Sequence, residues 1–165
     1  MQLLHSIDYH DFTIDELCDY LEERHYKQIL SDMEITHYYL THLSYTEQLD
    51  SAELINILFR KLQIELKQLF TKDSILIFPH LKKRSEVYVN LEPINTIHQK
   101  INGLLQQIRK LLNNYIQQPH WSSSIKICCN ELYSLEQEVQ LVLYLKENFL
   151  WTKINAASNE YKNEY

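Results

Sequence analysis

The sequence predicts an all-α protein, a single up-down-up-down four-helix bundle. Its 165 residues include one glycine and three prolines. Hairpins and tight turns need residues with positive φ, which glycine adopts most readily, so this composition favours long helices joined by short polar loops. Four segments carry apolar residues at helical spacing, and short loops between them make neighbouring helices antiparallel. A chain of this length can bury one core without disulfides.

The first helix is expected to begin at the segment TIDE, residues 13–16. Thr13 as the N-cap and Glu16 three residues later form a capping box, in which each side chain accepts a hydrogen bond from the other residue's backbone N–H. Residues 1–12 therefore form a lead-in to the bundle. The helix is expected to continue to about Ser44 on apolar residues at helical spacing, which are Leu17, Leu21, Ile29, Met33, Leu40 and Leu43.

A second helix is expected from Ser51 to a stop at Pro79, because proline inside a helix removes a hydrogen bond and clashes with the preceding turn. Its core-facing stripe contains one acid, Asp73, and an acid at a buried position is unusual enough to need a reason. The stripe proceeds in steps of three or four through Leu54, Leu58, Leu62, Leu66, Leu69, Asp73 and Leu76.

The third helix is expected from Pro93 to a break at Pro119, with Gly103 in its middle. Glycine at such a position costs up to about 1 kcal/mol relative to alanine, and the close approach of a neighbouring helix would explain it.

The fourth helix is expected to begin at a serine cap within residues 122–124, and its stripe contains one base, Lys146. The bundle would then span residues 13–156, and the polar residues 157–165 would form a tail that frays. The stripe consists of Leu132, Leu135, Val139, Val142, Lys146 and Phe149.

Composition also indicates which classes of partner and which cellular compartment to expect. The 16 basic and 22 acidic residues give a net charge of −6, which argues against nucleic acid because that partner requires a basic face. No apolar segment is long enough to cross a bilayer, and the first residues lack the pattern of a signal peptide, so a cytoplasmic protein is expected. The three cysteines lack the spacing of a zinc site and are interpreted as buried thiols.

Four motifs, taken in order, resemble the hemerythrin-like iron–sulfur cluster repair di-iron proteins, also called repair of iron centres proteins. The motifs are DELCDYLEERHY, FTKDSILIFP, INGLLQQIRKLLNNYIQQP and LYLKENFLW, and the resemblance covers residues 13–154. It implies a bundle that holds two non-haem irons with five histidines and two bridging glutamates. It also implies a role in restoring iron–sulfur clusters damaged by oxidative or nitrosative stress.

The resemblance implies a set of ligand positions that this chain mostly fills with other residues. His42 is the one position that matches, whereas His25 and His98 stand one residue from their expected places. One residue turns a helix by about 100°, so these two histidines could not both be ligands without a local distortion. The ligand positions fall on Tyr26, His42, Leu69, Asp73, Gln99, Val142 and Lys146.

Asp73 and Lys146 stand where the two bridging glutamates of that family would face each other. Our hypothesis is that a core ion pair has replaced the metal, with Leu69 and Val142 filling the space of lost imidazoles. Alternatively, Lys146 extends its ammonium to the surface and buries only its stem. A reduced iron site made of His42, Asp73 and Tyr26 is conceivable, but a nearby lysine would repel the cation.

Two hypotheses for function follow. The first is membership by descent in the repair family, with a role in stress response that needs non-haem iron if the ancestral site is retained. The second is a metal-free bundle without cofactor that binds a protein partner or regulates a true di-iron relative, and a homodimer is one form it could take. We find no catalytic residue set, because the single glycine excludes phosphate-binding loops and no Ser-His-Asp or Cys-His set can be assembled.

Overall fold

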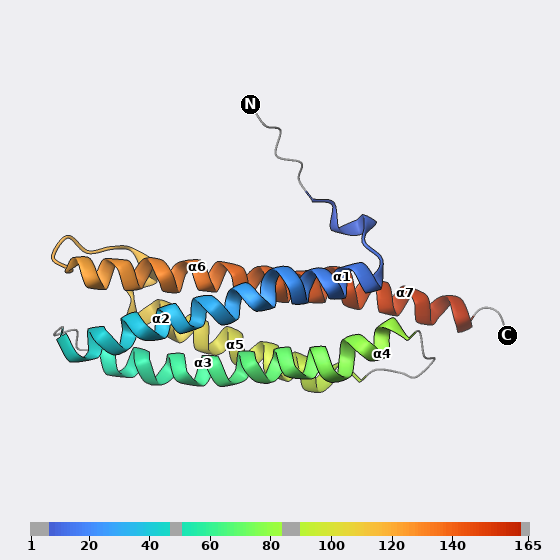
Figure 1. The fold of residues 1–165 in the computed structure, drawn as a ribbon, viewed down its shortest axis with the longest axis horizontal. Helices are drawn as coiled ribbons and strands as arrows, with labels where there is room; N and C mark the ends of the chain where they lie inside the picture. Colours follow the sequence, from blue (N-terminus) through green and yellow to red (C-terminus); the bar gives the residue numbers. More distant parts are fainter. Residues whose placement is uncertain (1–6, 47–50, 84–89, 163–165) are drawn as a thin grey trace, which may run out of the picture.

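The computed structural model describes residues 7–46, 51–83 and 90–162. In those ranges every regular element is a helix, and the helices form four rods packed as a bundle around one hydrophobic core (Figure 1). The prediction of an all-α bundle is therefore confirmed. None of the helices in the described part of the chain is both long and apolar enough to cross a membrane.

The first rod begins as predicted. Thr13 Oγ1 accepts a hydrogen bond from the Glu16 N–H at 3.2 Å, and Glu16 Oε2 accepts one from the Thr13 N–H at 2.8 Å. A short 3₁₀ turn, η1 (Tyr9–Asp11), precedes this cap. The rod then consists of α1 (Ile14–Tyr20), the π-helical turn η2 (Leu21–Tyr26) and α2 (Lys27–Thr46).

The second rod does not stop at Pro79, as the sequence suggested. It consists of α3 (Ala52–Lys72), the π-helical turn η3 (Asp73–Ile77) and α4 (Phe78–Lys82). Pro79 lies in the first turn of α4, directly after the wider π turn, where the Phe78 N–H donates to the Asp73 C=O five residues back. Because of this change of pitch, the helix continues through Pro79, which has no N–H to donate.

The same π turn changes which side chains face the core. Leu58, Leu62, Leu66 and Leu69 are buried as predicted, but Leu76 is exposed. After η3 the buried positions are those of Phe78 and Leu81, because the extra residue in the turn rotates the following side chains. Leu54, near the start of α3, is also exposed rather than part of the core.

The third rod, α5 (Glu92–Leu111), ends earlier than the predicted break at Pro119. Asn113, Asn114 and Tyr115 have φ values of 51°, 55° and 61°, in the left-handed region, and form the short 3₁₀ turn η4. Asparagine tolerates this region better than most residues, so the two consecutive asparagines end the helix.

The fourth rod consists of α6 (Ser123–Leu145), the π-helical turn η5 (Lys146–Leu150) and α7 (Trp151–Lys162). Ser122 is the cap, with its Oγ accepting from the Ile125 N–H at 3.3 Å. The described part of the predicted tail, residues 157–162, has a helical backbone.

The helices pack in a defined order. α2 contacts both α3 and α6, and α3 contacts α5. Figure 1 shows α1, α4 and α7 at the same end of the bundle, so the three π turns that precede or follow them lie toward that end.

The explanation offered for Gly103 is wrong. A Cβ atom built on this residue meets no heavy atom within 4 Å, so no neighbouring helix requires the glycine. We therefore expect Gly103→Ala to raise the free energy of unfolding by roughly 0.5–1 kcal/mol, since alanine restricts the unfolded chain and favours the helix. Urea denaturation of the two proteins measures the difference. Leu105→Ala, at a buried position on the same helix, should instead lower it by about 2–5 kcal/mol.

Candidate functional site

Three π turns bring three polar side chains into the core. Tyr26 is the last residue of η2, Asp73 is the first of η3 and Lys146 is the first of η5. A π turn contains an extra residue and shifts the side chains around it, and such turns are frequent at functional sites. This coincidence makes the region around Asp73 the candidate functional site.

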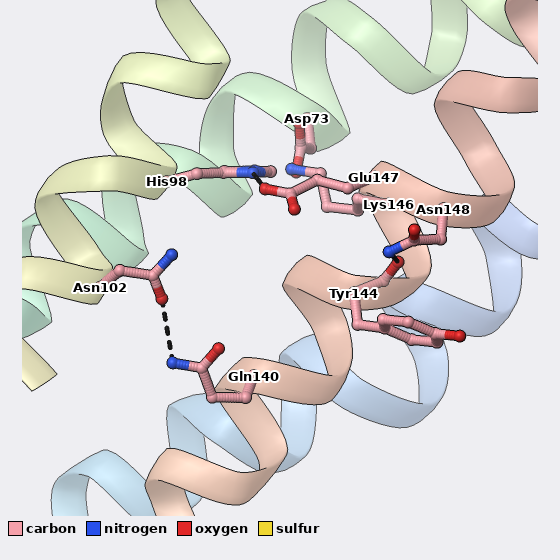
Figure 2. A network of polar contacts seen from close by, with 8 residues as sticks. All are labelled: Asp73, His98, Asn102, Gln140, Tyr144, Lys146, Glu147 and Asn148. Atoms are coloured by element: carbon pink, nitrogen blue, oxygen red, sulfur yellow. Dashed lines mark hydrogen bonds and ion pairs between the residues drawn. The ribbon is translucent and has the colours of Figure 1, made fainter.

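Asp73 accepts two hydrogen bonds on one oxygen. The Lys146 Nζ lies 2.5 Å from Asp73 Oδ2, and the Tyr26 hydroxyl donates to the same atom at 2.6 Å. The side chains of Asp73 and Lys146 have no exposed surface, and Tyr26 is buried as well. Lys146 therefore does not extend to the surface, and the structure brings together the residues of the hypothesised ion pair (Figure 2).

Aromatic rings contact two members of this network. The Tyr26 ring stacks on Phe70, with centroids 3.9 Å apart and planes 12° from parallel. The Lys146 Nζ lies 5.4 Å from the centroid of the Trp151 ring, a cation–π contact. Leu69 and Val142, one turn before Asp73 and Lys146 respectively, are both buried.

Burial sets the protonation behaviour of the network. Desolvation and the neighbouring Asp73 charge raise the pKa of the Tyr26 hydroxyl well above its ordinary value, so Tyr26 is a hydrogen-bond donor. Desolvation lowers the pKa of the Lys146 ammonium, and the Asp73 carboxylate opposes this effect. Because Asp73 accepts from two donors through one oxygen, we interpret it as an ionised carboxylate paired with a charged lysine.

Two buried histidines each lie against a glutamate. His25 Nδ1 is 3.3 Å from Glu138 Oε2, and His98 Nδ1 is 2.9 Å from Glu147 Oε1. Since a carboxylate only accepts hydrogen bonds, Nδ1 carries the proton in both rings. The Nε2 atom of each ring is buried and has no hydrogen-bond partner. Figure 2 shows His98 extending from α5 toward Asp73 and Lys146.

The structure places one of the assigned positions differently. His25 and Tyr26, adjacent in the π turn η2, are both buried, so Tyr26 faces the core as assigned and His25 does so beside it. On α5, which is a regular helix, His98 is buried while Gln99 is exposed. The interior position of α5 is therefore His98 and not Gln99, about 100° away around the helix.

His42 lies far from this site. Its side chain is exposed, and its ring lies parallel to that of Tyr38 with centroids 6.5 Å apart. Sixteen residues separate it from Tyr26 along the first rod, a rise of about 24 Å. The structure therefore does not assemble the reduced iron site suggested from His42, Asp73 and Tyr26.

The sequence reasoning missed the glutamates that hold the two histidines. Glu138 precedes the stripe residue Val139, and Glu147 follows the stripe residue Lys146. An acid next in sequence to a buried stripe residue can reach polar groups at the edge of the core. The positions of these two glutamates in the sequence could therefore have identified them as partners of the histidines. The π turns left no signal in the spacing of apolar residues.

The residues around Asp73 do not fit a di-iron centre. Within residues 7–46, 51–83 and 90–162, no three His, Cys, Asp or Glu side chains lie close enough together to hold a metal ion. More directly, the ammonium of Lys146 bonds to the carboxylate that would have to bind the metal, and its positive charge repels a cation.

Comparison with known proteins adds no relative: no protein-family model matches the chain, and no curated protein matches it. The fold and the site define the protein as an all-helical bundle with a buried tyrosine–aspartate–lysine network.

Asp73→Ala should lower the free energy of unfolding by about 3–5 kcal/mol, because it leaves the Lys146 charge buried without its partner. Combining Asp73→Leu with Lys146→Met should recover most of that loss, since an apolar pair has no charge to desolvate. Urea denaturation of the single and double variants measures both effects.

The matched control is the exposed pair formed by Lys67 and Glu34, whose loss should cost less than about 1 kcal/mol. A double variant no more stable than Asp73→Ala would show that the two charges are not energetically coupled.

Stability should fall as the pH decreases through the range of His98. Burial and the charge of Lys146 lower the pKa of His98 below its ordinary value, while Glu147 and Asp73 oppose this. Between the folded-state pKa and about pH 6.5, the unfolded chain then binds more protons than the folded one. The free energy of unfolding therefore decreases as the pH falls through this range. The decrease is at most about 1.4 kcal/mol per pH unit.

His98→Gln should therefore flatten the pH dependence of the urea midpoint between about pH 7.5 and pH 5.5. His120→Gln, at an exposed position, serves as the control and should leave the slope unchanged. The same slope in His98→Gln and in the original protein would contradict this account.

Proposed function

We propose that this protein is a divergent member of the hemerythrin-like iron–sulfur cluster repair group, with an up-down-up-down bundle whose di-iron site has been replaced by an ion pair. In this proposal it is a metal-free module that binds a protein partner, or regulates a true di-iron relative, during oxidative or nitrosative stress. The proposal rests on the four motifs for ancestry and on the core network for mechanism.

The contact between Lys146 and Asp73 carries the proposal. In the resemblance described above, the two positions correspond to carboxylates that bridge metal ions. Here one position keeps an acid, and the other supplies an ammonium 2.5 Å from it. The ammonium gives the carboxylate the positive charge that a metal would have given, and the tyrosine at position 26 adds a neutral donor.

Burial favours a binding role over an enzymatic one. Asp73 and Lys146 have no exposed side-chain surface, so neither charged group can touch a substrate at the surface. The three thiols are also buried, and burial raises the pKa of Cys18 and Cys128 to about 12. Thiols of that kind are poor nucleophiles, because the reactive form is the thiolate.

One observation favours the alternative of a retained iron-dependent activity. In metal sites, a histidine usually donates one ring N–H to a carboxylate and binds the metal through the other nitrogen. His25 and His98 have this hydrogen-bonding arrangement, with Nδ1 beside a glutamate and Nε2 without a partner. Metal binding at Asp73 would nevertheless require Lys146 to leave it.

The first test is metal content. The protein purified without chelator should contain no stoichiometric iron by mass spectrometry and show no ferric absorption, because the ammonium occupies the carboxylate. Treatment with a chelator should leave its circular dichroism unchanged. About two irons per chain would contradict the proposal and would support the iron-dependent alternative.

Lys146→Glu provides the complementary variant, since it removes the repelling charge and adds a carboxylate beside Asp73. If the ammonium is what excludes the metal, this variant should bind more iron than the original protein. Lys153→Glu, at a lysine whose Nζ contacts the His10 backbone carbonyl instead, is the matched control and should bind none.

A further inference from the structure

Positive charge is concentrated on two adjacent helices of this acidic protein. α3 and α5 together contain seven basic and three acidic residues, a net charge of +4 in a chain whose total is −6. These two helices pack against each other. Three of the basic residues are already paired: Lys67 with Glu34 on α2, Arg109 with Glu136 on α6, and Lys100 with Glu65 on α3 itself. The remainder of the chain carries the excess of acid.

Helix α3 also exposes apolar side chains. Ile57 and Ile64 on α3 are 47% and 65% exposed, and their spacing of seven positions corresponds to about two helical turns, which places them on one face. Arg60, Lys61 and Lys67 lie in and beside this interval. The exposed side of α3 thus combines apolar contacts with positive charge.

A hollow of about 430 Å³ lies between α3 and α5 beside Ile64. Its lining includes Lys61, Ile64, Glu65, Lys100, Gly103 and Leu104. We call it the α3–α5 groove.

Gly103 explains why the groove is open. Its missing side chain would meet nothing inside the protein, so the glycine serves no internal packing. Any larger residue would project into the groove. Across it, Lys100 Nζ lies 3.7 Å from Glu65 Oε1, while Glu65 Oε2 is buried and lacks a partner. The lining of the groove therefore combines the apolar Ile64 and Leu104 with a carboxylate oxygen that can still accept a hydrogen bond.

We propose that the α3–α5 groove binds an acidic amphipathic helix of a partner protein. This inference rests on the proposed function, for which it supplies the binding surface and the chemistry of the partner. A furrow between two helices suits a third helix, which anchors itself through apolar residues spaced one and two turns apart. Its apolar residues would contact Ile57, Ile64 and Leu104, and its carboxylates would face Lys61 and Lys100.

A second copy of this chain fits the groove less well. The acidic helix that it offers is the first rod, where Asp15, Asp19, Glu22 and Glu23 are clustered. From Ile14 to Glu34, however, that rod exposes no large apolar side chain, and its exposed Ile35 and Tyr38 lie about three turns beyond the acidic cluster. It would satisfy the charges of the groove and leave Ile57 and Ile64 uncovered.

The experiment uses a fluorescent synthetic peptide of about 18 residues, with leucines at helical spacing and glutamates on the other faces. Its control is the same peptide with lysine in place of glutamate. Fluorescence anisotropy with the full chain should show at least about tenfold tighter binding of the acidic peptide, and salt should weaken that binding.

Two variants locate the binding. Ile64→Asp should weaken binding of the acidic peptide about tenfold, because it places a carboxylate on the apolar anchor. Gly103→Met should weaken it similarly by filling the groove, without lowering stability, since space is open around residue 103. Ile127→Asp, at an isoleucine that is 44% exposed on α6, should leave binding unchanged.

Equal binding of the two peptides, or no binding, would overturn the inference. Tighter binding to anionic lipid vesicles or to single-stranded RNA than to the acidic peptide would also overturn it. Self-association in sedimentation that Ile64→Asp abolishes would identify a second copy as the occupant instead. These outcomes are independent of metal content, so the inference can fail while the metal-free proposal holds.

Discussion

Lys146 and Asp73 can share the interior of this bundle only as partners, and that requirement constrains the elements around them. An isolated buried charge is far more costly than a paired one, so the second and fourth rods must keep a fixed register to hold the two atoms in contact. Tyr26 adds the first rod to the same contact. His98, through Glu147, adds the third, so one polar layer joins all four rods.

The π turns are the structural means by which this layer is accommodated. Each of the three rods that contribute to the Tyr26–Asp73–Lys146 network changes pitch at the contributing residue. The polar side chains of this network therefore coincide with the irregular segments of the backbone.

Much of the fold could be predicted because it depends on local signals, such as the Thr13 capping box and the apolar stripes. Asp73 and Lys146 could be identified as candidates because each interrupts such a stripe. The errors at Leu76 and Pro79 share a physical origin, since neither a periodicity of 3.6 residues nor a proline rule indicates a local change of helical pitch. The error at Gln99 has another origin, because α5 is regular and the position was assigned from a motif match that was off by one residue. His42 was misplaced because the motif match took no account of its distance along the first rod from Tyr26, a rise of about 24 Å. The glutamates of the two histidine pairs depend on contacts between rods, which no local pattern records.

The two charged partners are separated by 73 positions along the chain. Helical rods form from local contacts on a short timescale, but this pair forms only when the second and fourth rods are both in place. A compact intermediate that lacks the fourth rod would have to bury Asp73 alone or keep that region hydrated. We therefore expect the polar layer to discourage partly assembled states and to make folding of the two halves of the chain more cooperative, a kinetic benefit distinct from any contribution to final stability.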